Sequence, residues 1–176
     1  LILALAACGG TSSDPPSGGP SPSNNPPTAN PIVGIGSHSL TPQDLTDIHS
    51  LGITHVRITL YTAWWEADEA YRVEWAAGVR RAAAHGLRLL VTVHQVPTDW
   101  TAERFGWWLH DRAEDIGYAI EVWQIGNENW SLPGSLPPVE YAEFFNAAKY
   151  AVQKAAPHAL VVALHGGSGH GRSFLW

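Results

Sequence analysis

The feature that most constrains this chain is a regular alternation of apolar runs and helical segments after residue 31. The apolar runs have the length and the bounding turn residues of strands, and they cover residues 31–36, 53–61, 87–94, 160–164 and a fourth run that begins at 120. The segments between them have helical spacing and cover residues 41–51, 67–85, 101–116 and 137–157. Strands and helices that alternate over short connections are typical of an all-parallel α/β fold.

Local signals set several of the expected helix boundaries. Thr41 is an N-cap residue followed by Pro42 at the first helical position, which starts the first helix. One continuous second helix over residues 67–85 is closed by Gly86, and Gly117 is expected to stop the third helix.

Two architectures have this alternation, a doubly wound sheet and a (β/α)8 TIM barrel. A complete barrel takes about 250 residues, whereas about 145 residues follow residue 31. No glycine-rich phosphate loop follows the first strand, and Gly34-Ile35-Gly36 is too weak a match to count as one. The charged and polar residues at the strand ends, described below, favour the barrel. We predict an α/β TIM barrel domain over residues 32–176, truncated after about the fifth strand, with the doubly wound domain as the alternative.

The segment before this domain has two parts with different expected roles. Residues 1–8 form an apolar run that ends in Leu5-Ala6-Ala7-Cys8 and is followed by Gly9, which resembles the lipobox of bacterial lipoproteins. The resemblance implies that Cys8 becomes the lipid-bearing N-terminus, and the chain has no second cysteine for a disulfide. The alternative is a small-residue sequence that surrounds a free thiol by chance.

Residues 9–31 are almost wholly Gly, Ser, Thr, Pro, Asn and Asp, so they bury too little surface to offset the entropy of ordering. We expect a disordered linker that holds the domain away from a membrane, with the protein lipid-anchored in the bacterial cell envelope on its extracytoplasmic side. The net charge of -6 argues against a nucleic-acid partner, which would require a basic face.

Chemically active side chains fall at the ends of the predicted strands. Asn127 and Glu128 follow the fourth strand, Arg57 lies on the second strand and His94 ends the third. The carboxyl ends of barrel strands form the active sites of TIM-barrel enzymes, so these residues are expected to converge. The alternatives are ordinary turn polarity for Asn127-Glu128, a core ion pair for Arg57 and a satisfied interior histidine for His94.

In this strand order the chain resembles the clan A retaining glycoside hydrolases, a barrel superfamily that includes cellulases, mannanases and xylosidases. The resemblance covers residues 32 to about 164 and implies that Glu128 is the general acid/base and that Asn127 holds the sugar 2-hydroxyl. It also implies that Arg57 orients the nucleophile and that His94 lines the substrate site. A retaining glycosidase needs a second carboxylate about 5 Å from the first.

The chain departs from the family at that second carboxylate. In the clan the nucleophilic glutamate ends the seventh strand, and only five strands are predicted here. Glu66, Asp68, Asp99 and Glu103 follow earlier strands, and none has the setting of that nucleophile. We assign no nucleophile, so the sequence is expected to be an inactive fragment of a glycosidase.

Tryptophans in the predicted loops add to the expectation of a carbohydrate substrate. Trp64 and Trp65 follow the second strand, Trp100 the third and Trp130 the fourth. Flat aromatic faces stack on pyranose rings, so Trp64, Trp65 and Trp130 are candidate sugar contacts. The helical tryptophans are expected in the core and comprise Trp75, Trp107 and Trp108.

Two other classes of function remain open. A metal-dependent barrel hydrolase is suggested by five histidines: His38, His55, His94, His165 and His170. The typical His-x-His pair after the first strand is absent, however, because Ser37-His38-Ser39 offers only one ligand. The second open class is a noncatalytic surface lipoprotein that binds glycans. We favour the glycosidase, with no cofactor and no metal ligands assigned, and expect a monomer at full length.

Overall fold

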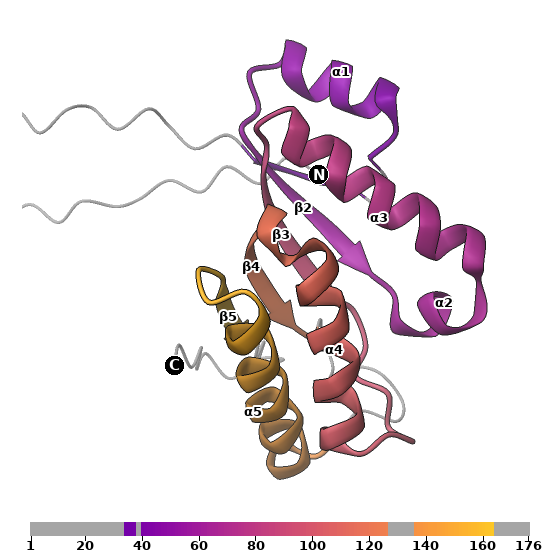
Figure 1. The fold of residues 1–176 in the computed structure, drawn as a ribbon, viewed down its shortest axis with the longest axis vertical. Helices are drawn as coiled ribbons and strands as arrows, with labels where there is room; N and C mark the ends of the chain where they lie inside the picture. The colour runs from indigo at the N-terminus through magenta and orange to yellow at the C-terminus, as the bar shows by residue number, and fades with distance from the viewer. Residues whose placement is uncertain (1–33, 38–39, 127–135, 164–176) are drawn as a thin grey trace, which may run out of the picture.

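The computed structural model describes residues 34–37, 40–126 and 136–163 as a parallel sheet packed against helices (Figure 1). The strands are β1 Gly34–Ser37, β2 His55–Leu60, β3 Arg88–Val93, β4 Ile120–Ile125 and β5 Leu160–Ala163. The helices are α1 Pro42–Ser50, α2 Thr62–Ala67, α3 Glu69–Ala84, α4 Ala102–Ile116, α5 Pro138–Ala155 and the short 3-10 helix η1 Gly117–Ala119. None of these helices has the length and apolar character needed to cross a bilayer.

The order of the strands distinguishes between the two predicted architectures. The five strands lie in the order β1-β2-β3-β4-β5, and every neighbouring pair is parallel. A doubly wound sheet requires a reversal of strand order at which the helices change faces. The described strands have no reversal, so the doubly wound alternative is wrong. The chain is an α/β protein with a singly wound five-stranded sheet, which is consistent with part of a barrel.

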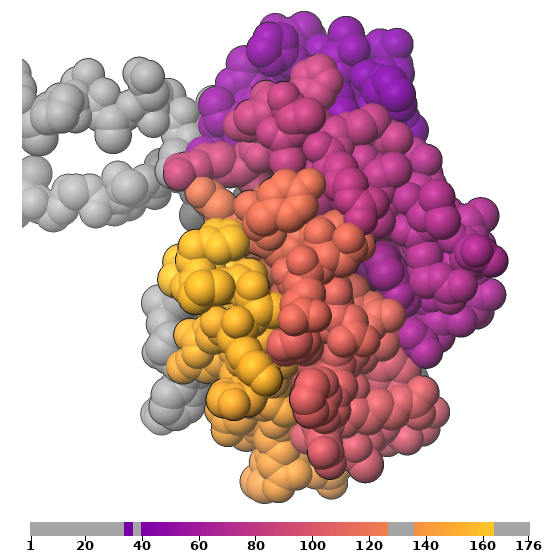
Figure 2. All heavy atoms as spheres, in the orientation of Figure 1, coloured from indigo at the N-terminus to yellow at the C-terminus, as the bar shows by residue number. Residues whose placement is uncertain are grey.

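Alternate residues of β2 show which face of the sheet the helices cover. Val56, Ile58 and Leu60 are buried, whereas Arg57 on the opposite face is exposed. Helices α4 and α5 lie in front of the sheet in Figure 1 and α3 runs alongside β2, and the atoms of the three helices form successive bands in Figure 2. Right-handed connections between sequential parallel strands place all the helices on one side. The other face carries the polar residues of β2 and is called here the inner face.

The starts of the predicted helices follow the sequence signals, but the structure has one further helix, α2, that was not predicted. Thr41 forms a capping box with Asp44, as its position before Pro42 predicts. The helix predicted over residues 67–85 is α3, Glu69–Ala84, whereas α2, Thr62–Ala67, forms where the sequence analysis expected a loop. The break lies at Asp68, whose extended backbone lets its carboxylate accept from the Tyr71 backbone N–H at 3.1 Å and cap α3.

The end of α4 is correctly predicted, but its physical basis is different. The helix ends at Ile116 and Gly117 is the C-cap, yet Gly117 is right-handed, with φ −60° and ψ −25°. A Cβ on Gly117 would lie 2.9 Å from the Cβ of Ala156, which follows α5. Glycine is therefore required for close approach of two segments and not for a left-handed turn.

Candidate active site at the strand ends

The carboxyl ends of β2, β3 and β4 are held level by backbone hydrogen bonds. The His94 N–H donates to Leu60 O at 2.9 Å, and the Gly126 N–H donates to Val93 O at 2.9 Å. Tyr61 and His94 are therefore side by side as the first residues beyond β2 and β3. Their ring centroids are 4.8 Å apart. In Figure 1 the strands run toward the end of the molecule where α2 lies, so the candidate site is at that end.

Arg57 lies on the inner face and points toward these strand ends. Its Nε donates to Thr92 Oγ1 at 2.8 Å, although Arg57 is paired with Leu90 in the sheet register. Thr92 is two residues nearer the carboxyl end of β3 and is fully buried. The hydrogen bond therefore directs the guanidinium along the strands, and Arg57 is exposed on the inner face and not buried in a core.

The end of β4 is fixed by two side chains that the sequence analysis did not identify. Tyr141 of α5 donates from Oη to Ile125 O at 2.6 Å, and Gln124 Nε2 donates to Gly126 O at 3.0 Å. Burial raises the pKa of Tyr141 to about 12, so it remains a hydrogen-bond donor at neutral pH. Gly126 has φ +81°, a backbone conformation that favours glycine.

Several predicted site residues lie outside the described part of the chain. Asn127, Glu128 and Trp130 follow Gly126 directly in sequence but are outside the described residues, and so is Cys8. The structure describes Arg57, His94, Trp64 and Trp65.

Trp64 lies in a row of aromatic rings above β2. Its ring centroid is 4.3 Å from that of Tyr61, at an interplanar angle of 31°, and 5.6 Å from that of Tyr71 in an edge-to-face contact. Tyr71 Oη accepts from the Tyr61 backbone N–H at 3.1 Å, and burial raises the pKa of Tyr71. Trp64 is nevertheless 56% exposed. The row Trp64–Tyr61–His94, called here the rim aromatic row, joins α2 to the end of β3.

Tyr61 is the ring that the sequence analysis missed. The strand alternation already places it on the same side as Arg57, and that periodicity is the signal that could have identified it.

Two of the other tryptophans, Trp65 and Trp107, differ from the sequence expectations. Trp65 is on α2 and not in a loop, and it is only 8% exposed, with its ring against Trp75 and Trp108. It is therefore a core residue and not an available sugar contact. Trp107, expected in the core, is 59% exposed on α4. The Trp100 ring after β3 is covered on one side by the Arg104 guanidinium, 4.2 Å from the ring centroid.

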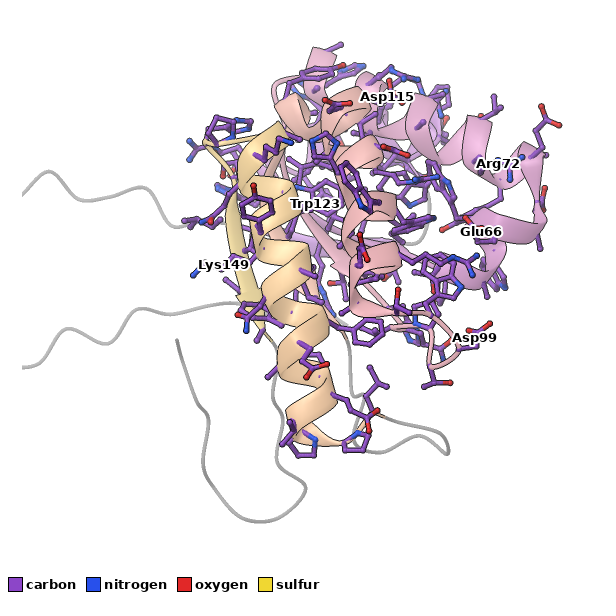
Figure 3. The ribbon with its side chains drawn as sticks, turned by 60° about the horizontal axis from the view of Figure 1, so that its bottom comes forward. Glu66, Arg72, Asp99, Asp115, Trp123 and Lys149 are labelled. Atoms are coloured by element: carbon purple, nitrogen blue, oxygen red, sulfur yellow. The ribbon has the colours of Figure 1, made fainter. Side chains whose placement is uncertain are left out.

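Charged groups near α2 stabilise this tryptophan cluster. Glu66 Oε1 accepts from Trp108 Nε1 at 2.8 Å, and Arg72 Nη1 donates to Trp65 O at 2.9 Å. Arg112 lies over the Trp108 ring at 4.6 Å, and burial lowers its pKa. Figure 3 shows Glu66 and Arg72 together at the corner between α2 and α3. The Glu66 carboxylate is thus committed to packing of α2 on α4.

Of the five histidines that suggested the metal-dependent alternative, the structure describes His55 and His94, whereas His38, His165 and His170 lie outside the described residues. His55 begins β2 and His94 follows β3, so the two are separated along the sheet by about 20 Å, six strand residues at about 3.3 Å each. The potential ligand group found among the described residues is His110, Asp111 and Glu114. All three come from α4, and both carboxylates are exposed, an arrangement that is common without a metal.

Comparison with known proteins shows the fold and not the family. No family model matches the chain, and no curated protein matches it in sequence. The AHE enzyme from Alicyclobacillus herbarius superposes with a TM-score of 0.52 and 18% identity, covering 68% of this chain and 34% of that one. A cellulase in complex with an inhibitor superposes with a TM-score of 0.52 and 15% identity, covering 75% of this chain and 50% of that one.

The chain thus spans about a third to a half of the length of these solved chains. At such low identity the similarity is limited to the fold. This protein therefore shares its α/β fold with part of each of these solved chains.

Proposed function

We propose that this protein is part of a retaining glycoside hydrolase that cleaves O-glycosyl bonds of an oligosaccharide or polysaccharide. Glu128 is the general acid/base, and Asn127 binds the sugar beside it. Arg57 keeps the partner carboxylate ionised and oriented, and His94 contacts the substrate. The second carboxylate required by double displacement is assigned to no residue of this chain.

The observation that carries the proposal is the convergence of Arg57, Tyr61 and His94 at the end of the sheet to which β4 also leads. The Arg57 guanidinium points toward this end through Thr92, and His94 lies there beside Tyr61. The Gly126 N–H donates to Val93 O at the end of β3, so β4 ends level with β3, and residues 127 and 128 follow Gly126 directly in sequence. A cation, an imidazole and aromatic rings at the strand ends are suited to sugar binding, and Glu128, two residues after Gly126 in sequence, supplies a carboxylate for acid catalysis.

The test is Glu128→Gln in the full-length gene product, assayed on two kinds of substrate. Glycosides with poor leaving groups need a proton at departure and should lose turnover by a factor of about 100 or more. Activated aryl glycosides need no such proton and should still form the glycosyl-enzyme. Azide should then restore turnover and yield a glycosyl azide of retained configuration, because a small anion attacks the intermediate without general-base help.

The matched control is Glu121→Gln on the same strand. Glu121 Oε1 is 2.8 Å from Arg88 Nε near the amino end of the sheet, so this variant should keep activity on both substrates. Equal loss of activity by Glu128→Gln on both substrate types, without an azide product, would refute the acid/base assignment. Sugar affinity without turnover in the unsubstituted protein would instead support the noncatalytic glycan-binding lipoprotein.

We also propose that residues 1–8 and 9–31 anchor the domain to the bacterial cell envelope through a lipid on Cys8. The lipobox-like sequence before Gly9 and the linker composition support this proposal. A tethered enzyme of this kind would act on carbohydrate outside the cytoplasm.

A further inference from the structure

Trp64 differs from the other described tryptophans at the strand ends because it is fixed and yet exposed. One face of its ring packs on Tyr61 at 4.3 Å, and its edge contacts Tyr71 at 5.6 Å. More than half of the side chain is nevertheless exposed. An exposed aromatic ring held on one side presents its opposite face to a ligand with little loss of side-chain entropy.

The segment that carries Trp64 is anchored at both ends. Thr62 Oγ1 donates to Gln95 O at 3.0 Å, which joins the start of α2 to the loop after β3. Arg72 Nη1 donates to Trp65 O, and Asp68 caps α3 immediately after α2. The position of the Trp64 ring relative to His94 is therefore set by hydrogen bonds on each side of it.

The rim aromatic row leads away from β4, where the proposed acid/base follows. Two ring contacts of 4.8 Å and 4.3 Å separate His94 from Trp64. The end of β2 is two strand spacings from the end of β4, about 10 Å at about 4.8 Å per strand. This span is longer than one pyranose ring. A sugar stacked on Trp64 therefore belongs to a unit of the substrate other than the one whose bond is cleaved.

We propose that Trp64 is a platform for a distal sugar unit and makes the protein selective for oligosaccharide chains over single glycosides. This inference rests on the proposed function and deepens it by naming the substrate class. Planar apolar rings bind the C–H face of any pyranose, so Trp64 selects substrates by chain length and not by the identity of the sugar.

The test compares Trp64→Ala with the unsubstituted protein, both as full-length gene products, on substrates that differ in length alone. Aryl glycosides of single glucose, xylose and mannose units are paired with aryl glycosides of the corresponding β-linked oligosaccharides. The variant should lose about tenfold or more in kcat/KM on the long substrates, as expected for truncation of an aromatic anchor, and change little on the short ones. Trp64→Phe keeps a ring and should recover part of the loss.

Trp107→Ala is the matched control. Trp107 has the same side chain, lies on a helix and is 59% exposed, compared with 56% for Trp64. Its ring contacts His110 and Lys154 on the outer surface of α4 and α5. This variant should leave both substrate lengths unaffected.

Two results of the kinetic assay would overturn the inference. Equal loss on long and short substrates would mean that Trp64 supports the site structurally, and unchanged kinetics on both would mean that it has no role. If the unsubstituted protein cleaves none of the substrates, the proposed catalysis fails separately. Calorimetric binding of the same oligosaccharides then decides the inference, because equal affinity of Trp64→Ala and unsubstituted protein would refute the platform.

Discussion

The substitution Gly117→Ala should change stability in two opposing ways, through the local backbone conformation and through a tertiary contact. Gly117 has the right-handed helical backbone that alanine prefers, so the local effect alone would stabilise the protein by about 0.4–1 kcal/mol. The new Cβ would, however, lie 2.9 Å from the Ala156 Cβ and 3.5 Å from the Ala113 Cβ. Overpacking of a close-packed contact costs about 1–3 kcal/mol. The tertiary term is larger, so the net loss should be about 1–2 kcal/mol.

Thermal unfolding followed by circular dichroism measures this effect. A chain of this length loses about 2–4 °C of Tm per kcal/mol, so the expected decrease is about 2–8 °C. The control is the same substitution in an Ala156→Gly background, where the opposing methyl group is gone and Gly117→Ala should become neutral or stabilising. A higher Tm for Gly117→Ala in the original background would refute the reasoning, because the local term would then exceed the contact.

Two further predictions concern α5 and the N-terminus. Because the pKa of Tyr141 is about 12 when folded and 10.0 ordinarily, the unfolded chain loses this proton first, and stability should fall as pH rises from about 10 to 12. Tyr141→Phe should lower stability by about 1 kcal/mol at neutral pH, because the hydrogen bond to Ile125 O is lost, and should reduce the loss of stability between about pH 10 and 12. Denaturant titrations that show the same loss of stability at alkaline pH in this variant would contradict the prediction. In a bacterial host the full-length precursor should incorporate labelled palmitate and partition with membranes, and Cys8→Ser should do neither; a Cys8→Ser protein that is still lipidated would disprove the anchor.

The sequence by itself determined the elements, because their signals are local. Alternation of apolar and helical segments indicated five parallel strands and the positions of α1, α3, α4 and α5, but not that of α2. The Thr41 cap and the alternation along β2, with Arg57 and Tyr61 opposite Val56, depend on residues a few positions apart. The convergence of Arg57 and His94 followed from the rule that parallel strands end at a common edge.

Tertiary packing decided what local signals leave open. Trp64 and Trp65 are neighbours in sequence, as are Trp107 and Trp108, yet in each pair one ring is exposed and the other is buried. Gly117 satisfies a helix-stop pattern, but the close approach of Ala156 is what requires glycine there. The order of the strands also emerged only from their pairing. In each case the deciding contact joins residues far apart in the chain, and a periodic pattern over a few neighbouring residues cannot predict such a contact.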